Sequence, residues 1–162
     1  MKKWFWVLLL LFFGCKKVFD PFSHKIPTSP IERFKTAADT VTVSGRQCYL
    51  QVYLYRDFMP IVPPGGNPLI AIINAIAEGP EAFPNNAVVD SLWIYSGDEV
   101  WVSILSEPGA GDPSKSNRIT KVARNGPKWE PGTLADVFVR IVEDGKRIQF
   151  LRALKQPIQA TF

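Results

Sequence analysis

The sequence offers few residues that could carry out covalent or metal chemistry. His24 is its single histidine, and Cys15 and Cys48 are its two cysteines. A serine or cysteine nucleophile needs an imidazole held beside it, and a structural zinc site needs four cysteine or histidine ligands. His24 stands between Pro21 and Pro27, in a segment with the composition of a linker. We therefore expect no catalytic residue, no metal and no cofactor.

Adjacent carboxylates occur twice, at Asp98-Glu99 and at Glu143-Asp144. Each pair adjoins a glycine at an expected hairpin turn, where acidic residues commonly stabilise the conformation of the turn. The Gly-Gly pair at 65–66 lacks the lysine and the serine or threonine that complete a phosphate-binding loop. The sequence therefore predicts a protein that is not an enzyme.

Three aromatic residues form the candidate binding patch. Alternating side chains predict a hairpin with strands at 88–95 and 99–105, joined by a loop of three residues. This register places Trp93 opposite Trp101, so that Trp93, Tyr95 and Trp101 share one face. Aromatic side chains give a large contact area at low entropic cost, as protein and sugar sites require. The alternative is that the three rings cap the core or pack beneath a loop.

Composition and charge limit the classes of protein further. Hydrophobic residues make up 46% and charged residues 21% of the 162 positions, and 14 prolines and 11 glycines interrupt the chain. Residues 37–114 carry a net charge of −7 and residues 115–162 a net charge of +6. Such halves can pair within one domain or attract charged partners, and we expect mainly the first. Nucleic acid is not an expected partner, because the overall net charge is only +4.

Short β-branched and aromatic runs between turn residues predict further strands. Residues 47–55 alternate, so that Cys48 shares a face with aliphatic residues while three tyrosines lie on the other face. We expect Cys48 to be a buried, inert thiol. Further strands are expected at 40–43, 118–124 and 158–162, and the run at 69–78 could be a strand or a short helix, of which we predict the strand.

The Asp-Gly turn at 144–145 predicts a second hairpin, which pairs Ile141 with Ile148 and Val139 with Phe150. About eight short strands without a convincing helix predict an all-β domain over residues 37–162, an antiparallel Ig-like β-sandwich. The Trp-Glu-Pro-Gly-Thr segment at 129–133, followed by a strand, resembles the W-x-P-G turn of many bacterial Ig-like modules.

The N-terminus has the features of an export signal. Lys2 and Lys3 precede an unbroken apolar run over residues 4–13, which Gly14 and Cys15 follow. A basic head, an apolar core and a small residue define a secretory signal peptide, and this run is too short to cross a hydrocarbon core of about 30 Å. We therefore assign residues 1–14 to a signal peptide.

The Leu-Phe-Phe-Gly-Cys segment at 11–15 resembles the lipobox of bacterial lipoproteins, in the relaxed form of the Bacteroidota. In that family the cysteine is lipidated and the peptide before it is removed, which implies a lipid anchor at Cys15. The alternative is a plain signal peptide with an incidental Cys15, and a Cys15–Cys48 disulfide would require that alternative. Residues 15–36 are rich in proline and are expected to form an extended tether. By the same resemblance, Lys16 and Lys17 imply the outer membrane, on its periplasmic side.

These features predict a non-catalytic, lipid-anchored protein of the cell envelope that acts as a binding or assembly module. Its expected partners are the membrane, through Cys15, and an envelope protein or a glycan. The alternative is an Ig-fold inhibitor of secreted proteases. Such an inhibitor would present a loop at one end of the sandwich, and the stiff, apolar stretch at 59–68 suits that use.

Overall fold

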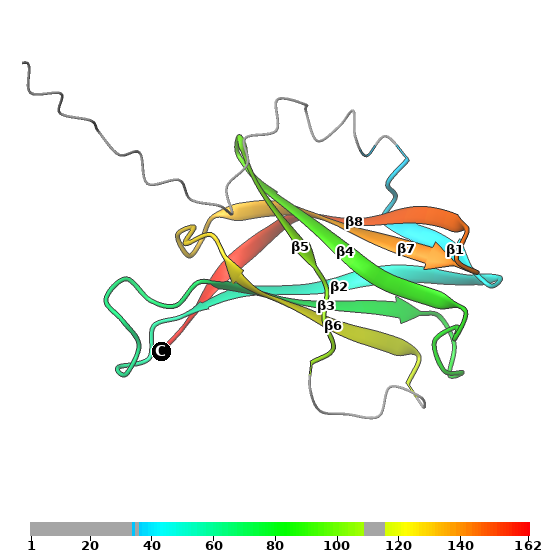
Figure 1. The fold of residues 1–162 in the computed structure, drawn as a ribbon, viewed down its shortest axis with the longest axis horizontal. Coiled ribbons are helices and arrows are strands. Elements are labelled where there is room, and N and C mark those ends of the chain that lie inside the picture. Colours follow the sequence, from blue (N-terminus) through cyan, green and yellow to red (C-terminus); the bar gives the residue numbers. More distant parts are fainter. Residues whose placement is uncertain (1–33, 35, 109–115) are drawn as a thin grey trace, which may run out of the picture.

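The computed structural model describes residues 34, 36–108 and 116–162 (Figure 1). The predicted all-β class is confirmed within these ranges, and the run at 69–78 forms a strand rather than a helix. No helix in the described ranges is long and apolar enough to span a bilayer. The eight strands are β1 (Thr40–Val43), β2 (Arg46–Asp57), β3 (Leu69–Ala77), β4 (Ala87–Ser96), β5 (Glu99–Ile104), β6 (Arg118–Gly126), β7 (Leu134–Glu143) and β8 (Arg147–Thr161).

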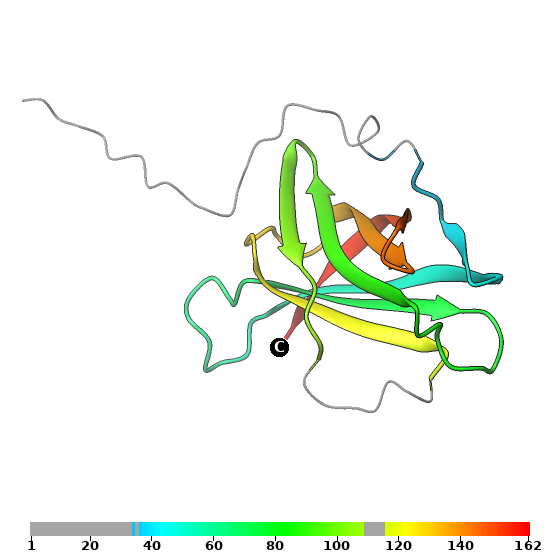
Figure 2. The same ribbon diagram turned by 45° about the vertical axis from the view of Figure 1, so that its right-hand side comes forward.

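The strands form one mixed sheet in the order β5-β4-β7-β8-β2-β3-β6, with β1 paired to β2. Figures 1 and 2 show this sheet curled into a half-barrel. β8 links two halves of the sheet, one made of β4, β5 and β7 and the other of β1, β2, β3 and β6. Residues 147–157 of β8 pair antiparallel with β7, and residues 158–161 pair parallel with β2. The prediction of a purely antiparallel sandwich is therefore wrong. The edge strand expected at 158–162 is the continuation of β8.

A bulge in β8 turns this strand from one partner to the other. Opposite the step from Ala135 to Val137 in β7, β8 contains one extra residue. Lys155 has a φ of 53° there, and its N–H donates to Asp136 Oδ1 at 2.9 Å. Because a bulge bends its strand and increases the local twist, the end of β8 is directed toward β2.

The main core lies inside the curl and is closed where β5 and β6 approach each other. Ser106, just after β5, exchanges two backbone hydrogen bonds with Val122 of β6, at 3.0 and 2.9 Å. Gly126 of β6 leaves room for the ring of Trp101, which would stand 2.7 Å from an added Cβ. The largest apolar side chains of this core come from both halves of the sheet: Leu54, Leu69, Ile73, Leu92, Ile94, Trp101, Ile141, Leu151 and Ile158.

The β4–β5 hairpin is shifted by one residue from its predicted register. The loop has two residues, not three, and Gly97 occupies its first position with a φ of 60°. Glycine at that position is typical of a type II′ hairpin turn. Trp93 therefore pairs with Val102, and Trp101 pairs with Ile94. Since a shift of one residue reverses the faces of a strand, Trp93 and Trp101 lie on opposite sides of the sheet.

The β7–β8 hairpin is shifted from its predicted register by one residue in the same sense, although its loop is longer than predicted. Its loop has three residues rather than two, because Glu143 pairs with Arg147. Val139 consequently pairs with Leu151, which joins the core, and not with Phe150. Phe150 packs instead against a second cluster on the outer face of the sheet.

The oppositely charged halves of the chain pair within the domain, as expected. Arg140 holds Asp90 through two hydrogen bonds of 2.8 and 2.7 Å. This contact joins β7 to β4 across the middle of the outer face. Among the described residues, four ion pairs link the two halves. In three of them the acidic residue belongs to 37–114, namely Asp39–Arg152, Asp90–Arg140 and Glu107–Lys121, and the fourth is Arg56–Glu130.

Candidate functional site

The three aromatic residues predicted to form a binding patch lie on both faces of the sheet. Trp101 is only 2% exposed and belongs to the main core. Trp93 and Tyr95 lie in the outer-face cluster. The expected common face is therefore wrong, and the register of the β4–β5 hairpin is the reason. Cys15, the predicted site of lipidation, lies outside the described residues.

The outer-face cluster is covered by the segment that precedes β1. Phe34 is 4% exposed and stacks on Phe138, with ring centroids 4.5 Å apart and 13° between the planes. It also contacts Trp93 and Phe150, at centroid distances of 5.3 and 5.2 Å. Phe34 falls within the stretch 15–36 that was expected to be an extended tether. Trp93 therefore helps to fasten this part of the chain to the domain.

A different aromatic surface lies on the outer side of β2 and β3. Tyr49 and Tyr53 are 40% and 42% exposed, although both lie well within a strand. Each tyrosine of this surface stands opposite an isoleucine of β3, so apolar pairs repeat along the two strands. We call it the Tyr–Ile face; its members are Tyr49, Tyr53, Tyr55, Ile70, Ile72 and Ile76.

The sequence alone predicted the tyrosines of the Tyr–Ile face but not its isoleucines. The alternation over 47–55 placed the three tyrosines on one side, and the structure confirms that arrangement. The isoleucines alternate within an almost continuous apolar run, so their outward direction follows only from the register of β2 with β3. The face was therefore missed as a candidate site.

A second surface is the loop at 58–68, which joins β2 to β3 and is folded by two β-turns. The Val62 N–H donates to the Met59 carbonyl and the Gly66 N–H to the Pro63 carbonyl, both at 3.0 Å. In each turn the second residue is proline, and Gly65 has a φ of 83° at the third position of the second turn. Proline followed by a glycine of positive φ is the signature of a type II turn.

Arg56 holds the 58–68 loop from inside the molecule. Its side chain is 2% exposed, and its guanidinium donates to the carbonyls of Gly65 and, at 3.1 Å, of Asn67. The same group donates to the carbonyls of Lys128 and Trp129 at 3.3 and 3.2 Å. Hydrogen bonds from a charged donor are stronger than neutral ones, so one arginine joins the loop to the turn before β7.

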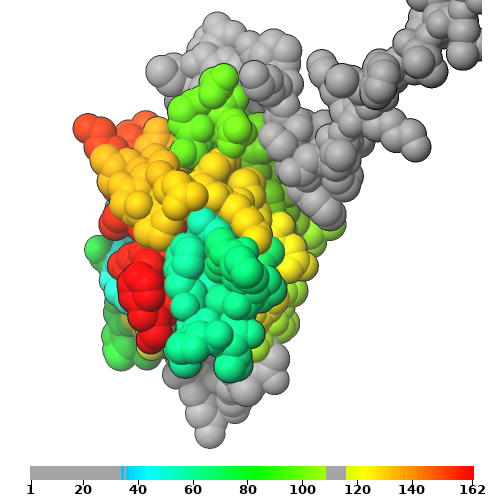
Figure 3. Space-filling model, turned by 90° about the vertical axis from the view of Figure 1, so that its left-hand side faces the viewer, coloured from blue at the N-terminus to red at the C-terminus, as the bar shows by residue number. Residues whose placement is uncertain are grey.

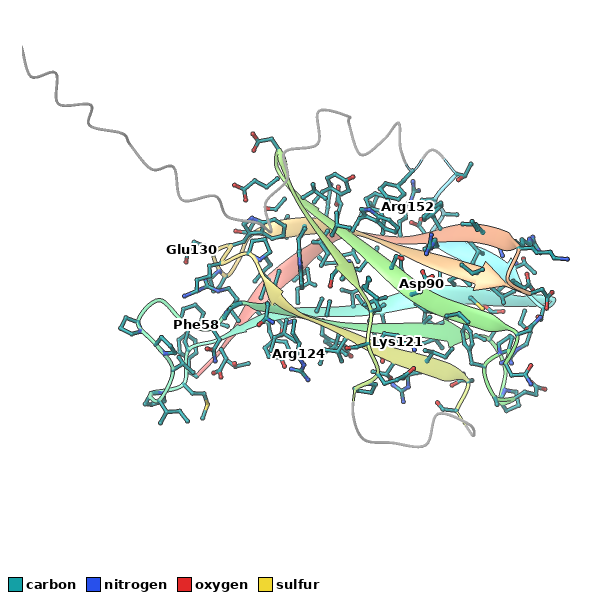
Figure 4. The ribbon with its side chains drawn as sticks, viewed as in Figure 1. Phe58, Asp90, Lys121, Arg124, Glu130 and Arg152 are labelled. Atoms are coloured by element: carbon teal, nitrogen blue, oxygen red, sulfur yellow. The ribbon has the colours of Figure 1, made fainter. Side chains whose placement is uncertain are left out.

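Two further contacts complete this support. The Arg56 guanidinium lies 4.8 Å from the centroid of the Phe58 ring and 3.8 Å from a carboxylate oxygen of Glu130. The Phe58 ring fills the space beside Gly66, where an added Cβ would stand 2.6 Å from it. Figure 4 shows Phe58 and Glu130 at the same end of the molecule, near Arg124.

The tip of the 58–68 loop is apolar and exposed. Ile61 is 94% exposed and Met59 is 45% exposed. Phe162, which follows β8, is 87% exposed, and the neighbouring Thr161 carbonyl accepts a hydrogen bond from the Phe58 N–H at 2.8 Å. Figure 3 shows the loop and the end of β8 side by side on this end of the molecule.

Two of the ionisable groups, the thiol of Cys48 and the carboxyl of Asp90, have shifted pKa values with structural causes. Cys48 is fully buried, and burial raises the pKa of its thiol, which disfavours the nucleophilic thiolate. The hydrogen bonds from Arg140 hold the pKa of Asp90 below its ordinary value, so this carboxyl stays ionised. The described residues contain no group of three or more His, Cys, Asp or Glu side chains that could hold a metal.

Comparison of the chain with protein-family models, with curated proteins and with solved structures gave no match.

Proposed function

We propose that this chain is a non-catalytic, lipid-anchored protein of the cell envelope that acts as a binding or assembly module. The Tyr–Ile face carries the proposal, because Tyr49 and Tyr53 keep 40% and 42% of their surface exposed on regular strands. Tyrosine offers a rigid ring for contact and a hydroxyl for hydrogen bonding, at a low cost in conformational entropy. An envelope protein or a glycan is the class of partner that such a face fits.

The N-terminal segment supplies the anchor in this proposal. The lipobox-like residues before Cys15 support lipidation, and the prolines between Cys15 and Phe34 suit a tether. Lys16 and Lys17 support the outer membrane on its periplasmic side. An Ig-like relationship is part of the same proposal, supported by the Trp-Glu-Pro-Gly turn at 129–132 that leads into β7.

The Tyr–Ile face is tested with a photoreactive amino acid at position 53, incorporated in growing cells. We expect a discrete crosslink to an envelope component, which the same group at Leu134, an exposed residue of β7, does not form. A parallel assay measures binding of the purified protein to isolated peptidoglycan and to lipopolysaccharide. Tyr49→Ser with Tyr53→Ser should abolish whichever interaction is found, and Leu134→Ser should not. Absence of both a crosslink and glycan binding would contradict the proposed face.

The anchor is tested by membrane fractionation of the wild type and the Cys15→Ala variant. After a wash with alkaline carbonate, which removes peripheral contacts, the wild type should remain with the outer membrane and the variant should leave it. External protease should digest the domain only after the outer membrane is opened, if it faces the periplasm. A Cys15→Ala variant that resists the carbonate wash as the wild type does would exclude the lipoprotein assignment.

The alternative function, inhibition of secreted proteases through residues 59–68, receives support from the rigid attachment of the loop by Arg56. Its two β-turns give it a compact shape, however, whereas proteases take substrates and substrate-like inhibitors in an extended form. We therefore prefer the binding module. A panel of secreted proteases assayed with micromolar protein separates the two, and Ile61→Asp should relieve any inhibition that is observed.

A further inference from the structure

We propose that the 58–68 loop inserts its tip into a lipid surface, giving the domain a membrane contact of its own besides the anchor proposed at Cys15. This contact does not depend on the Tyr–Ile face. It rests on the side chains of the loop, on its backbone hydrogen bonds, on its rigidity and on the charges beside it.

The side chains of the loop suit lipid better than a protein partner. Residues 58–68 include no charged residue, and Asn67 is the only one of them with a nitrogen or oxygen in its side chain. Asn67 lies at the base of the loop, where its amide donates to Asp57 at 3.3 Å. Interfaces between proteins carry regular hydrogen bonds around their apolar centre, which the exposed tip at 59–65 has no side chains to make. A convex apolar tip needs no complementary pocket in a bilayer.

Most backbone N–H groups of the loop have no need of water as an acceptor. An unpaired N–H is costly in lipid, because no acceptor replaces water there. Of the eleven residues at 58–68, four are prolines and have no N–H. Five others donate within the chain: Phe58, Met59, Val62, Gly66 and Asn67. Among the described contacts, only the N–H groups of Ile61 and Gly65 are left without an acceptor.

Rigidity makes insertion less costly. A flexible loop would lose conformational entropy when its tip is fixed in the interface. Here Arg56 binds two carbonyls of the loop, and Pro60 and Pro64 restrict the two turns. The tip is therefore presented in one shape before it meets a membrane.

The charges beside the loop favour an anionic surface. Arg124 and Lys128 are exposed near its base, and Arg124 is seen at this end in Figure 4. Asp57 accepts hydrogen bonds from the loop itself, and Glu130, whose side chain is 84% exposed, lies 3.8 Å from the Arg56 guanidinium. Together with Arg56, the basic residues beside the loop outnumber these two carboxylates by three to two. Basic residues beside an apolar tip are typical of segments that lie in the interface of membranes with anionic lipids.

The test compares two positions in the full chain reconstituted in vesicles. Ile61→Cys and Ile148→Cys each carry an environment-sensitive fluorophore. Ile148 is also an exposed isoleucine, at 55%, but it lies at the beginning of β8, whose other end meets the loop. The parent chain, with Cys15 and with the buried Cys48, gives the background signal. The vesicles contain phosphatidylcholine with phosphatidylglycerol, and spin-labelled phosphatidylcholine serves as the quencher.

We expect the label at 61 to shift its emission to shorter wavelength and to lose most of its fluorescence to the spin-labelled lipid. The label at 148 should show neither effect, which excludes mere closeness of the anchored domain to the bilayer. A label at Met59→Cys should be quenched in the same way, and Ile61→Asp should remove that quenching. Arg124→Ala with Lys128→Ala should weaken it in vesicles that contain phosphatidylglycerol.

A label at 61 that stays as accessible to water as the label at 148 overturns the proposal. An emission shift at 61 without quenching by the lipid would indicate a protein surface, such as a second copy of the chain, and overturns it as well. Because Ile61 is 94% exposed, its replacement leaves the packing of the domain unchanged. Fractionation of Cys15→Ala after the carbonate wash tests only the lipid anchor of the proposed function, so the two proposals fail separately.

Discussion

Arg46 and Arg56 stand near opposite ends of β2, and each donates hydrogen bonds to four backbone carbonyl oxygens of neighbouring loops. They are the two basic residues of the stretch 37–114. Arg46 holds the end of β3 and the segment that follows it, up to residue 82. Arg56 holds the 58–68 loop together with the turn at 128–129. A planar guanidinium has five N–H donors, so one arginine can donate to several backbone carbonyls that have no partner in a regular helix or sheet.

Arg56→Lys should lower the free energy of unfolding by about 2–3 kcal/mol, because an ammonium group cannot reach carbonyls spread over two loops and leaves some of them buried without a donor. Arg46→Lys is the matched control. Its side chain is 20% exposed, so water can replace part of the lost contacts and the loss should be smaller. Urea denaturation measures both. Hydrogen exchange at Gly66 and Asn67 should accelerate only in the Arg56 variant, and equal losses in the two variants would contradict the difference in burial.

Gly126→Ala should lower the free energy of unfolding by about 1–3 kcal/mol, since the added Cβ would stand 2.7 Å from the ring of Trp101. Trp101→Phe removes part of that ring and also costs stability on its own. The double variant should therefore be more stable than the sum of the two losses indicates. Denaturation of the single and double variants tests this coupling. Strict additivity would show that the edges of the sheet do not meet at this contact.

Asp90→Asn should lower the free energy of unfolding by roughly 1 kcal/mol at pH 7, within the range of partly exposed ion pairs. Arg140 lowers the pKa of Asp90 in the folded state, so the stabilisation is complete above the ordinary pKa of aspartate and is lost as pH falls through the folded pKa. The difference between wild type and variant should be constant above about pH 5 and should shrink below about pH 4. Denaturation across this range provides the measurement. A difference that grows on acidification would contradict the sign.

Phe34→Ala should lower the free energy of unfolding by about 3 kcal/mol, because it removes a buried ring from the cluster with Phe138, Trp93 and Phe150. Phe162→Ala removes the same atoms from a residue that is 87% exposed, and it should change stability by less than about 0.5 kcal/mol. Thermal denaturation compares the two. Acrylamide should quench Trp93 more strongly in the Phe34 variant. Equal stabilities would mean that the segment before β1 contributes nothing to the domain.

The strands could be predicted from the sequence because alternation and turn residues are local signals. Their pairing could not be predicted in the same way. Both hairpins were placed one residue out of register, since a glycine-containing turn accepts a loop of two or three residues. Because of this error of one residue, Trp101 was expected on the binding face but lies in the core. For the same reason Phe150 was expected to face inward, where Leu151 lies instead. The parallel contact of β8 with β2 has no local signal, because it joins segments about a hundred positions apart.

The candidate surfaces, too, could be predicted only where they depend on one short stretch of sequence. The tyrosines of β2 and the uncharged stretch at 58–68 are visible in the sequence. The support of that loop by Arg56 is not, because a single arginine in a strand gives no sign of which carbonyls it will meet. The Tyr–Ile face likewise needs the register of β3 to place Ile72 beside Tyr53.

The place of β8 in the sheet also determines when the domain can fold. β8 joins the half that contains β4, β5 and β7 to the half that contains β1, β2, β3 and β6, although it follows all of them in the chain. Neither half can be completed until Thr161 has been synthesised, and the closing contacts with β2 span most of the domain. Contacts of such long sequence separation make folding slow. A chain exported in an unfolded state would therefore reach the far side of the membrane before its sheet closes.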